Sequence, residues 1–272
     1  MFRFFTTFAT ILALSLLVNY LLLLNQKKVQ AENNAKKIET ILTENFERIE
    51  EVLISIGQKI ANDTETLDLK IIHKIFVQAS ALHGSNNIFS WSLFDWTNSD
   101  GYQTVSTMLG IRGKDSPEMS DRYYASLKGS KPWTLLLSKP ALGNPSGVFV
   151  IPIGVQIETK KAHRAGTVTA GINIQELTNI IEYRLNGDSP FALVDVRSDD
   201  LVLSSKEISK KSDEKIDKAD YISSRRMIHK FPYEIFVGYD EQQFWREVFD
   251  SSLLLFVQIV SVISGIIFLR KF

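Results

Sequence analysis

The sequence predicts an α+β protein in which an antiparallel sheet with helices on one side is held between two membrane-spanning helices. Two observations lead to this fold class. The chain of 272 residues carries an uncharged apolar stretch near each end, and the region between them changes from helical to strand periodicity. We expect the intervening residues to form one folded block on a single side of the membrane.

The two apolar stretches are residues 4–24 and 251–269, which contain no charged side chain. A helix of about 20 residues rises about 30 Å, enough to cross the hydrocarbon core of a bilayer. A cleaved signal peptide is the alternative for the first stretch, but its apolar part is long and a cleavage site at 29–31 would be poorly placed. A buried core helix is the alternative for the second stretch, and the basic pair Arg270 and Lys271 at its end argues against it.

Basic residues outside the two stretches predict the orientation. Arg3 precedes the first stretch and Arg270 follows the second, which places both ends in the cytoplasm under the positive-inside bias. Lys27 and Lys28 oppose this orientation, although long segments are translocated largely regardless of their charge. We therefore expect a multi-pass protein of the bacterial inner membrane with residues 26–250 on the periplasmic, extracytoplasmic side. The absence of cysteine excludes disulfides and thiol catalysis and fits a bacterial envelope protein.

Residues 32–84 are predicted to form stalk helices. Apolar side chains step by four, three, four, three and four along one seam: Leu42, Phe46, Ile49, Leu53, Ile56 and Ile60. One interpretation is a helix that packs on its own domain, and the other is a stalk that pairs with a second copy in a homodimer. A second helix is expected over 69–82.

Beyond the helices the apolar period becomes two, which predicts strands. Asn98-Ser99-Asp100-Gly101 supplies a hairpin turn, since Asp-Gly tolerates the positive φ that tight turns need. We assign a membrane-distal module to 88–185 and a smaller membrane-proximal module to 190–240. The expected strands of the first lie at 89–96, 102–107, 133–138, 148–157 and 166–174, followed by a helix at 175–183. Those of the second lie at 191–196, 200–203 and 226–239, before a helix that starts at 240.

Four stretches carry a resemblance to a known family. They are Asp121-Arg122-Tyr123-Tyr124, which matches an Asp-Arg-x-Tyr segment, Ser138-Lys139-Pro140 with residues 143–150, residues 166–173, and residues 231–240. In this order the chain resembles the extracytoplasmic Cache (PDC, PAS-like) sensor domains of bacterial histidine kinases, diguanylate cyclases and chemoreceptors over residues 38–250. The resemblance implies a PAS-like sheet with a long N-terminal stalk helix and a smaller membrane-proximal α/β module. It also implies a sensor that binds a small ligand and passes a conformational signal across the membrane.

The chain departs from the family after the second apolar stretch, because only Arg270, Lys271 and Phe272 follow it. No linker, phosphoacceptor helix, ATP-binding domain or cyclase domain is present in the sequence. We therefore expect a truncated or split sensor that acts through a separate kinase or cyclase. A membrane-anchored envelope scaffold that binds a partner protein is the alternative.

Catalysis is not expected in this chain. The four histidines are scattered without metal-ligand spacing, and no phosphate-binding loop or nucleophile elbow occurs. No cofactor or metal is predicted. Lys plus Arg equals Asp plus Glu at 31 each, so the net charge gives no sign of nucleic-acid binding.

The resemblance places the ligand between the sheet and the segment before the third strand. Arg122 offers a planar donor fork for a carboxylate, and Tyr124 could add a hydroxyl. Asp95 could accept a ligand ammonium or pair with Arg122. An aromatic wall is expected from three further residues: Trp91, Tyr102 and Trp133. For each residue the alternative is a structural role in the core or at the surface. The family's tighter amino-acid signature is not reproduced, so the ligand stays unassigned.

Overall fold

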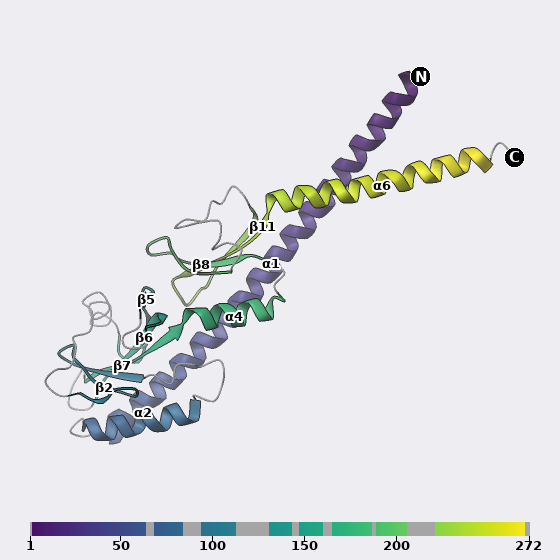
Figure 1. Cartoon of the computed structure of the whole chain (residues 1–272). Coiled ribbons are helices and arrows are strands. Elements are labelled where there is room, and N and C mark those ends of the chain that lie inside the picture. The colour runs from purple at the N-terminus through teal and green to yellow at the C-terminus, as the bar shows by residue number, and fades with distance from the viewer. Residues whose placement is uncertain are drawn as a thin grey trace.

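One helix runs through the whole molecule, and two sheets lie along it one after the other (Figure 1). The computed structural model describes residues 2–63, 68–83, 94–112, 131–142, 147–159, 165–186, 189–205 and 221–269. The helices are α1 (Phe2–Asp63), α2 (Leu69–His83), α4 (Ile174–Arg184) and α6 (Glu241–Leu269). The expected membrane span and stalk are thus a single continuous helix of 62 residues. Both chain ends lie at the same end of the molecule (Figure 1).

The sheet farther from the chain ends, called the distal sheet below, is antiparallel with the order β3-β2-β1-β7-β6-β4, and β5 pairs with β6. Its strands are β1 (Phe94–Asn98), β2 (Gln103–Ser106), β3 (Gly110–Ile111), β4 (Leu135–Leu137), β5 (Ala141–Leu142), β6 (Phe149–Ile157) and β7 (Gly166–Asn173). The predicted turn joins β1 to β2, with Gly101 at φ 94° and the Asn98 side chain accepting from the backbone N–H of Tyr102 at 2.9 Å. Residues 89–93 of the first expected strand lie outside the described residues.

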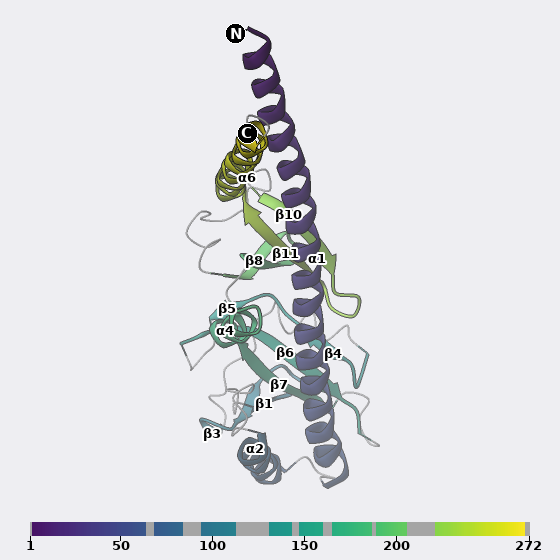
Figure 2. The same ribbon diagram turned by 90° about the vertical axis from the view of Figure 1, so that its right-hand side faces the viewer.

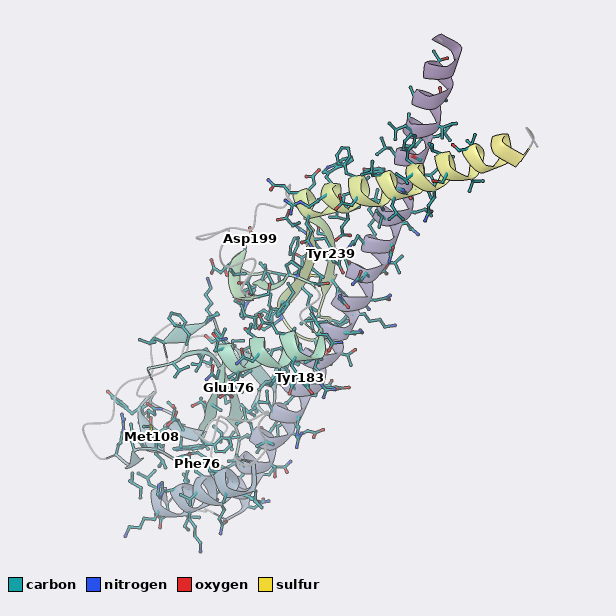
Figure 3. All side chains as sticks on the ribbon, turned by 45° about the vertical axis from the view of Figure 1, so that its right-hand side comes forward. Phe76, Met108, Glu176, Tyr183, Asp199 and Tyr239 are labelled. Atoms are coloured by element: carbon teal, nitrogen blue, oxygen red, sulfur yellow. The ribbon has the colours of Figure 1, made fainter. Side chains whose placement is uncertain are left out.

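The sheet nearer the chain ends, the proximal sheet, has the antiparallel order β10-β11-β8-β9. Its strands are β8 (Phe191–Asp195), β9 (Asp200–Ser204), β10 (Tyr221–Met227) and β11 (Tyr233–Asp240). The strand periodicity expected over 226–239 therefore belongs to two paired strands, because the chain reverses between Met227 and Tyr233. Figure 3 shows the order along the axis: Phe76 and Met108 lie at the distal end, Glu176 and Tyr183 on α4, and Tyr239 beside α6.

The apolar seam of α1 packs on the chain's own sheets. All six seam residues from Leu42 to Ile60 are buried, and α1 contacts β10 and β11 of the proximal sheet and β6 and β7 of the distal sheet. Phe46 meets Phe231 edge to face at 4.8 Å between ring centroids. Burying a large apolar side chain contributes about 1.5–3 kcal/mol, so this seam is a main source of the fold's stability. These side chains offer no surface to a second copy, and the seam itself gives no support to a dimer stalk.

Polar contacts tie the two sheets together at the edge strand β4. Glu50 on α1 accepts from the backbone N–H of Leu135 at 3.3 Å and from Lys230 Nζ at 2.6 Å. At the other end of β4, Arg197 Nη1 donates to the carbonyl oxygen of Leu137 at 3.0 Å. The strand is thus held at both ends by groups that also contact the proximal sheet.

The helices α1 and α6 cross near the chain ends and then diverge (Figures 1 and 2). Lys27 pairs with Glu247 at 2.8 Å, and Tyr20 stacks on Trp245 at 5.2 Å between ring centroids. Both helices contain a segment long and apolar enough to cross a membrane, by length and composition.

Candidate functional site

The distal sheet has one apolar and one polar face, and the polar face is the candidate site. On the apolar face, Phe94 lies 6.1 Å from Phe76 of α2, and Ile157 approaches α1 at Gly57, where an added Cβ would lie 2.1 Å from Ile157 Cδ1. Side chains alternate between faces along a strand. The residues that follow Phe94 and precede Ile157 therefore point to the side away from both helices.

Polar side chains occupy that second face in two rows. In the first row, Asp95 stands directly between Ser106 of β2 and Thr169 of β7. In the second row the paired positions are Gln103, Thr97, Thr167 and Gln156, on β2, β1, β7 and β6. Ser106, Thr97, Thr167, Thr169 and Gln156 are all buried, between 0% and 7% exposed. A face of buried hydroxyls and a buried amide around a half-buried carboxylate is unusual, because buried positions are mostly apolar.

Asp95 is the charged group of this face. Burial raises the pKa of its carboxyl to about 6, against the downward effect of hydrogen bonds with Ser106 and Gln103 and of the charge on Arg112. A half-buried carboxylate with incomplete compensation favours a cation beside it. The electrostatics therefore suit a positively charged group of a ligand.

Two buried hydroxyls near Asp95 have no hydrogen-bond partner within the described part of the chain: Thr97 Oγ1 and Thr104 Oγ1. Thr97 lies two residues after Asp95 on the same strand and is 0% exposed. The large majority of buried side-chain polar atoms are hydrogen-bonded, so such atoms are candidates for contact with a ligand or an ordered water. The other two atoms of this kind, Ser198 Oγ and Tyr233 Oη, belong to the proximal part of the fold.

The residues proposed from the sequence are distributed over several places. Asp95 lies on the polar face. Tyr102 lies at the β1–β2 hairpin and is 38% exposed, and Trp133 packs on the apolar side, where its ring approaches Gly57 of α1. The structure therefore does not bring Tyr102 and Trp133 together beside Asp95. Arg122, Tyr124 and Trp91 lie outside the described residues.

Sequence reasoning missed the threonines, Ser106 and Gln156 as site residues. A signal was present in Gly166-Thr-Val-Thr-Ala-Gly171, where polar Thr167 and Thr169 alternate with apolar neighbours inside a predicted strand. Such alternation indicates a strand with one polar face. It does not reveal that this face is buried, and burial is what makes it a candidate site.

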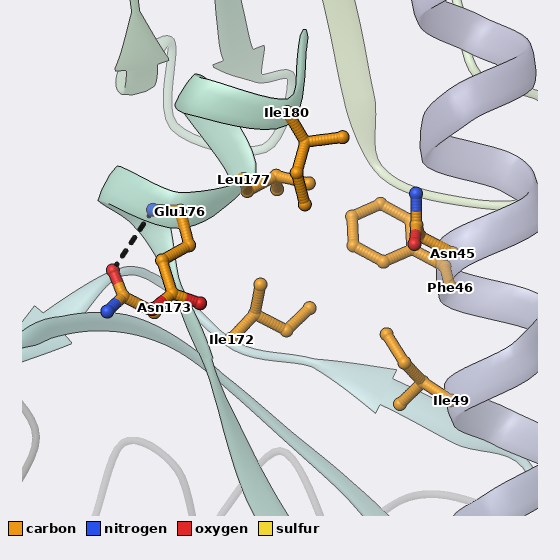
Figure 4. A pocket seen from close by; sticks show the side chains of 8 residues that line it. All are labelled: Asn45, Phe46, Ile49, Ile172, Asn173, Glu176, Leu177 and Ile180. Carbon is orange, nitrogen blue, oxygen red and sulfur yellow. Dashed lines mark hydrogen bonds between the residues drawn. The ribbon is translucent and has the colours of Figure 1, made fainter. Parts of the chain in front are cut away.

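A second hollow lies between α1 and α4. A small cavity there has a volume of ≈ 10 Å³, about the space of one water molecule. Its lining has Phe46 and Ile49 on one side and Leu177 and Ile180 on the other (Figure 4). It continues into an open groove of ≈ 850 Å³ lined by Lys37, Thr40, Ile41, Glu44, Asn45, Arg48, Asn179, Ile180, Tyr183 and Arg184. Exposed ends of flexible side chains make up much of this groove. Among the described residues, none that lines it has a buried side-chain nitrogen or oxygen without a hydrogen-bond partner. The polar face of the distal sheet is the stronger candidate.

Among the described residues, no group of three or more His, Asp or Glu side chains comes together in a way that could hold a metal ion. The chemistry on the polar face is therefore that of hydrogen bonds and one carboxylate. Such an arrangement can bind and orient a small polar molecule.

No family model matches the chain, and no curated protein matches it. Solved structures do match its fold. The extracellular domain of the histidine kinase rpHK1S-Z16 aligns with a TM-score of 0.61 at 18% identity, over 80% of this chain and 96% of that domain. The sensory domain of the Campylobacter jejuni chemoreceptor Tlp3 with isoleucine bound aligns with a TM-score of 0.59 at 10% identity, over 85% and 98%. The ligand-binding domain of the Pseudomonas fluorescens chemoreceptor CtaA in complex with L-leucine gives 0.58 at 17% identity, over 82% and 97%.

These matches confirm the expected likeness to Cache-type extracellular sensor domains at the level of the fold. At such low identity they establish the shared architecture, and the ligand has to be argued from the residues of this chain.

Proposed function

We propose that this chain is a membrane-anchored, extracytoplasmic sensor module that binds a small amine-bearing molecule on the polar face of the distal sheet. The observation that carries the proposal is Asp95, a carboxylate with a raised pKa on a buried polar face that also holds the unpartnered hydroxyl of Thr97. An ammonium ion beside Asp95 would restore the charge balance, and a polar oxygen of the ligand would accept from Thr97. Chemoreceptor domains of the same fold were solved with isoleucine and L-leucine, which makes amino acids and amines the first class to test.

The sequence-based candidates complete this proposal. Arg122 would bind a ligand carboxylate, and Tyr124 and Trp91 would line the same site within the distal module, residues 88–185. Recognition of both an ammonium and a carboxylate would select zwitterionic ligands, because each charged group needs an oppositely charged partner once it is buried.

Membrane anchoring is supported by the composition of α1 and α6 near the chain ends. Leu14, Leu22 and Leu254 are more than half exposed in helices that can cross a membrane by length. Tyr20 and Trp245 stack where the two helices meet, and such aromatic residues favour the interface between lipid and water. The folded block then lies outside the cytoplasm, and its signal passes to a histidine kinase or cyclase.

A thermal-shift screen of the full chain in mild detergent tests the proposal, using amino acids, amines and organic acids as ligands. A ligand that binds the native state raises the unfolding temperature, and Asp95→Asn and Thr97→Val should remove that shift. Asp100→Asn, which replaces an exposed carboxylate in the β1–β2 turn, is the matched control and should keep it. Absence of any stabilising ligand would favour an envelope scaffold, and a ligand shift that survives Asp95→Asn would refute the assigned site.

A further inference from the structure

Arg197, in the turn between β8 and β9, joins the edge of the distal sheet to the proximal sheet. Figure 3 marks this turn by Asp199. The Nη1 atom of Arg197 donates to the carbonyl oxygen of Leu137, at the end of β4, at 3.0 Å. Its Nε and Nη2 atoms donate to the carboxylate of Asp195 at 2.9 and 2.6 Å. One guanidinium therefore binds groups of both sheets at once.

Both partners of this guanidinium belong to strands that have a part in the proposed function, on which the inference rests. Leu137 pairs with Ile153 of β6, and β6 also carries Gln156 of the polar face. Asp195 is fully buried and pairs with Tyr233 of β11, the strand that continues into α6. A shift of β4 in the distal sheet can thus reach the strand that leads into the membrane.

The hydroxyl of Tyr233 is a second donor close to Asp195. Directly opposed residues of antiparallel strands have Cβ atoms about 4.5–5.5 Å apart. Tyr233 is fully buried, and its hydroxyl has no hydrogen-bond partner within the described part of the chain. Burial raises the pKa of this hydroxyl, the charge of Arg197 opposes the rise, and the charge of Asp195 adds to it. The group therefore keeps its proton and can donate to a carboxylate.

We propose that Arg197 is a latch between the two sheets, and that Tyr233 replaces it as the donor to Asp195 when the latch opens. In the closed arrangement, which the structure shows, the guanidinium binds both Asp195 and Leu137. In the open arrangement Arg197 turns to solvent, Asp195 accepts from the Tyr233 hydroxyl, and the end of β4 is released from the proximal sheet.

Two features make opening accessible. The side chain of Arg197 is 42% exposed, so water can replace its contacts. A hydrogen bond from Tyr233 lowers the cost of leaving Asp195 without its guanidinium, because an unpaired buried carboxylate is strongly destabilising. A ligand on the polar face then acts on the latch by binding one of the two arrangements more tightly.

A double-variant cycle, measured by urea unfolding of the full chain in mild detergent, tests the exchange of donors. Tyr233→Phe alone should change the unfolding equilibrium constant less than about twofold, because its hydroxyl has no partner in the closed arrangement. Arg197→Ala should raise that constant roughly tenfold more in the Tyr233→Phe chain than in the natural chain, since the natural chain keeps a donor for Asp195. Arg225→Ala, which removes an arginine paired with Glu234 at 3.7 Å, is the matched control and should cost the same in both chains. Equal costs for Arg197→Ala would overturn the exchange.

Chemical cross-linking reads the closed arrangement itself, and the natural chain has no cysteine to interfere. Lys139 follows β4 and Asp200 begins β9, and their side chains pair at 3.1 Å between the same two sheets. Cysteines at these two positions should be joined by a bifunctional thiol reagent about as long as the Lys139 side chain. Adding Arg197→Lys should slow the reaction roughly threefold or more without a matching loss of stability, because an ammonium still neutralises Asp195 but lacks the planar fork that also reaches β4. Tyr233→Phe should speed the reaction, since it disfavours the open arrangement.

The direction of these changes separates a latch from a purely structural contact. A rate that falls only together with the stability in Arg197→Lys, or a rate that Tyr233→Phe leaves unchanged, would refute the latch. Cysteines in place of Arg225 and Glu234, which pair within the proximal sheet, are the matched control and should react equally in every background. If the latch alone is wrong, a ligand shift that depends on Asp95 persists. If the ligand site alone is wrong, that shift is missing while the double-variant cycle and the cross-linking behave as expected.

Discussion

Replacing Asp95 by asparagine should stabilise the unliganded protein near neutral pH while it removes ligand binding. The carboxyl has a pKa of about 6 in the folded chain against an ordinary value of 3.8, chiefly because of burial. Well below pH 4 both the folded and the unfolded chain hold the proton. As pH rises toward 6 the unfolded chain loses the proton first, so the free energy of unfolding falls.

The magnitude follows from the size of the pKa difference. About two pKa units at 1.36 kcal/mol each correspond to a loss of about 3 kcal/mol, complete above pH 6. Asparagine has the shape of aspartate and keeps hydrogen-bonding capacity toward Ser106 and Gln103, but it carries no charge to desolvate. We therefore expect Asp95→Asn to gain about 2–3 kcal/mol over the natural chain at pH 7 and almost nothing at pH 4.

Urea unfolding of the full chain in mild detergent measures this gain between pH 4 and pH 7.5, with tryptophan fluorescence as the signal. Trp96 adjoins Asp95 and is 1% exposed, so its emission should report the opening of the distal sheet. Asp100→Asn should follow the pH dependence of the natural chain, because that carboxylate is exposed in a turn. A loss of stability at pH 7 in Asp95→Asn would refute the reasoning, as would an unchanged slope between pH 4 and pH 6.

Three further predictions concern the rest of the fold. Arg197→Ala leaves the fully buried Asp195 without its guanidinium, whose nearest nitrogen lies 2.6 Å away, and should lower the free energy of unfolding at pH 7 by about 2–4 kcal/mol. Burial alone would raise the pKa of Asp195, but the hydrogen bonds from Arg197 lower it overall. The stabilisation that this pair gives the natural chain should therefore be lost as pH falls toward acid. Equal stability of the two proteins at pH 7 would contradict the expectation. Gly166→Ala places a Cβ 2.5 Å from a backbone oxygen of β1 and should cost about 2–4 kcal/mol in the same urea assay; a cost below 1 kcal/mol would mean that β1 and β7 are less rigidly paired than described. Lys27→Glu should loosen α6 from α1, seen as faster hydrogen exchange at the start of α6, and adding Glu247→Lys should restore protection; no recovery in the double variant would deny the ion pair this role.

Local pattern was sufficient for strand β6 and helix α4. The strand expected over 148–157 is β6 (Phe149–Ile157), because branched apolar residues alternate there with Pro152, Gly154 and Gln156 between two loops. The helix expected over 175–183 is α4, which begins at Ile174 since Asn173 caps the backbone N–H groups of its first turn. In both cases the periodicity and the end signals lie within the segment itself.

The candidate site could not be obtained in the same way. Alternation in the sequence predicts that Leu135, Leu137 and Trp133 share one face of a strand. It does not tell which side chains of the neighbouring strands lie on the same face, because a shift of the strand register by one residue exchanges the two faces. The register of β1, β7 and β6 decides that Asp95 lies on the polar side. Trp133 lies in a turn before β4, with a φ of 63°, and its ring is on the side of α1. The short strands β3 and β5, of two residues each, were not predicted because pairing with longer neighbours specifies them rather than their own sequence. The contacts of Glu50 with β4 and with Lys230 join residues too far apart in sequence for any local pattern to indicate.

Under the proposed function, a ligand binds on the side of the distal sheet away from α1, and the chain leads from that sheet through α4 and the proximal sheet into α6. Strand β11 continues without a loop into α6, and two sets of contacts fix this junction to α1. The first set is a buried chain in which Asn34 of α1 donates to Ser189 at 2.8 Å and Ser189 shares a hydrogen bond with Tyr239 at 2.7 Å. The second is the partly exposed pair of Lys27 and Glu247, and ion pairs of that kind contribute about 1 kcal/mol or less. Breaking the buried chain would leave polar groups unsatisfied, so the smaller cost falls on the ion pair. We therefore infer that α6 pivots about the end of β11 as Lys27 and Glu247 separate, rather than sliding along α1 as a piston.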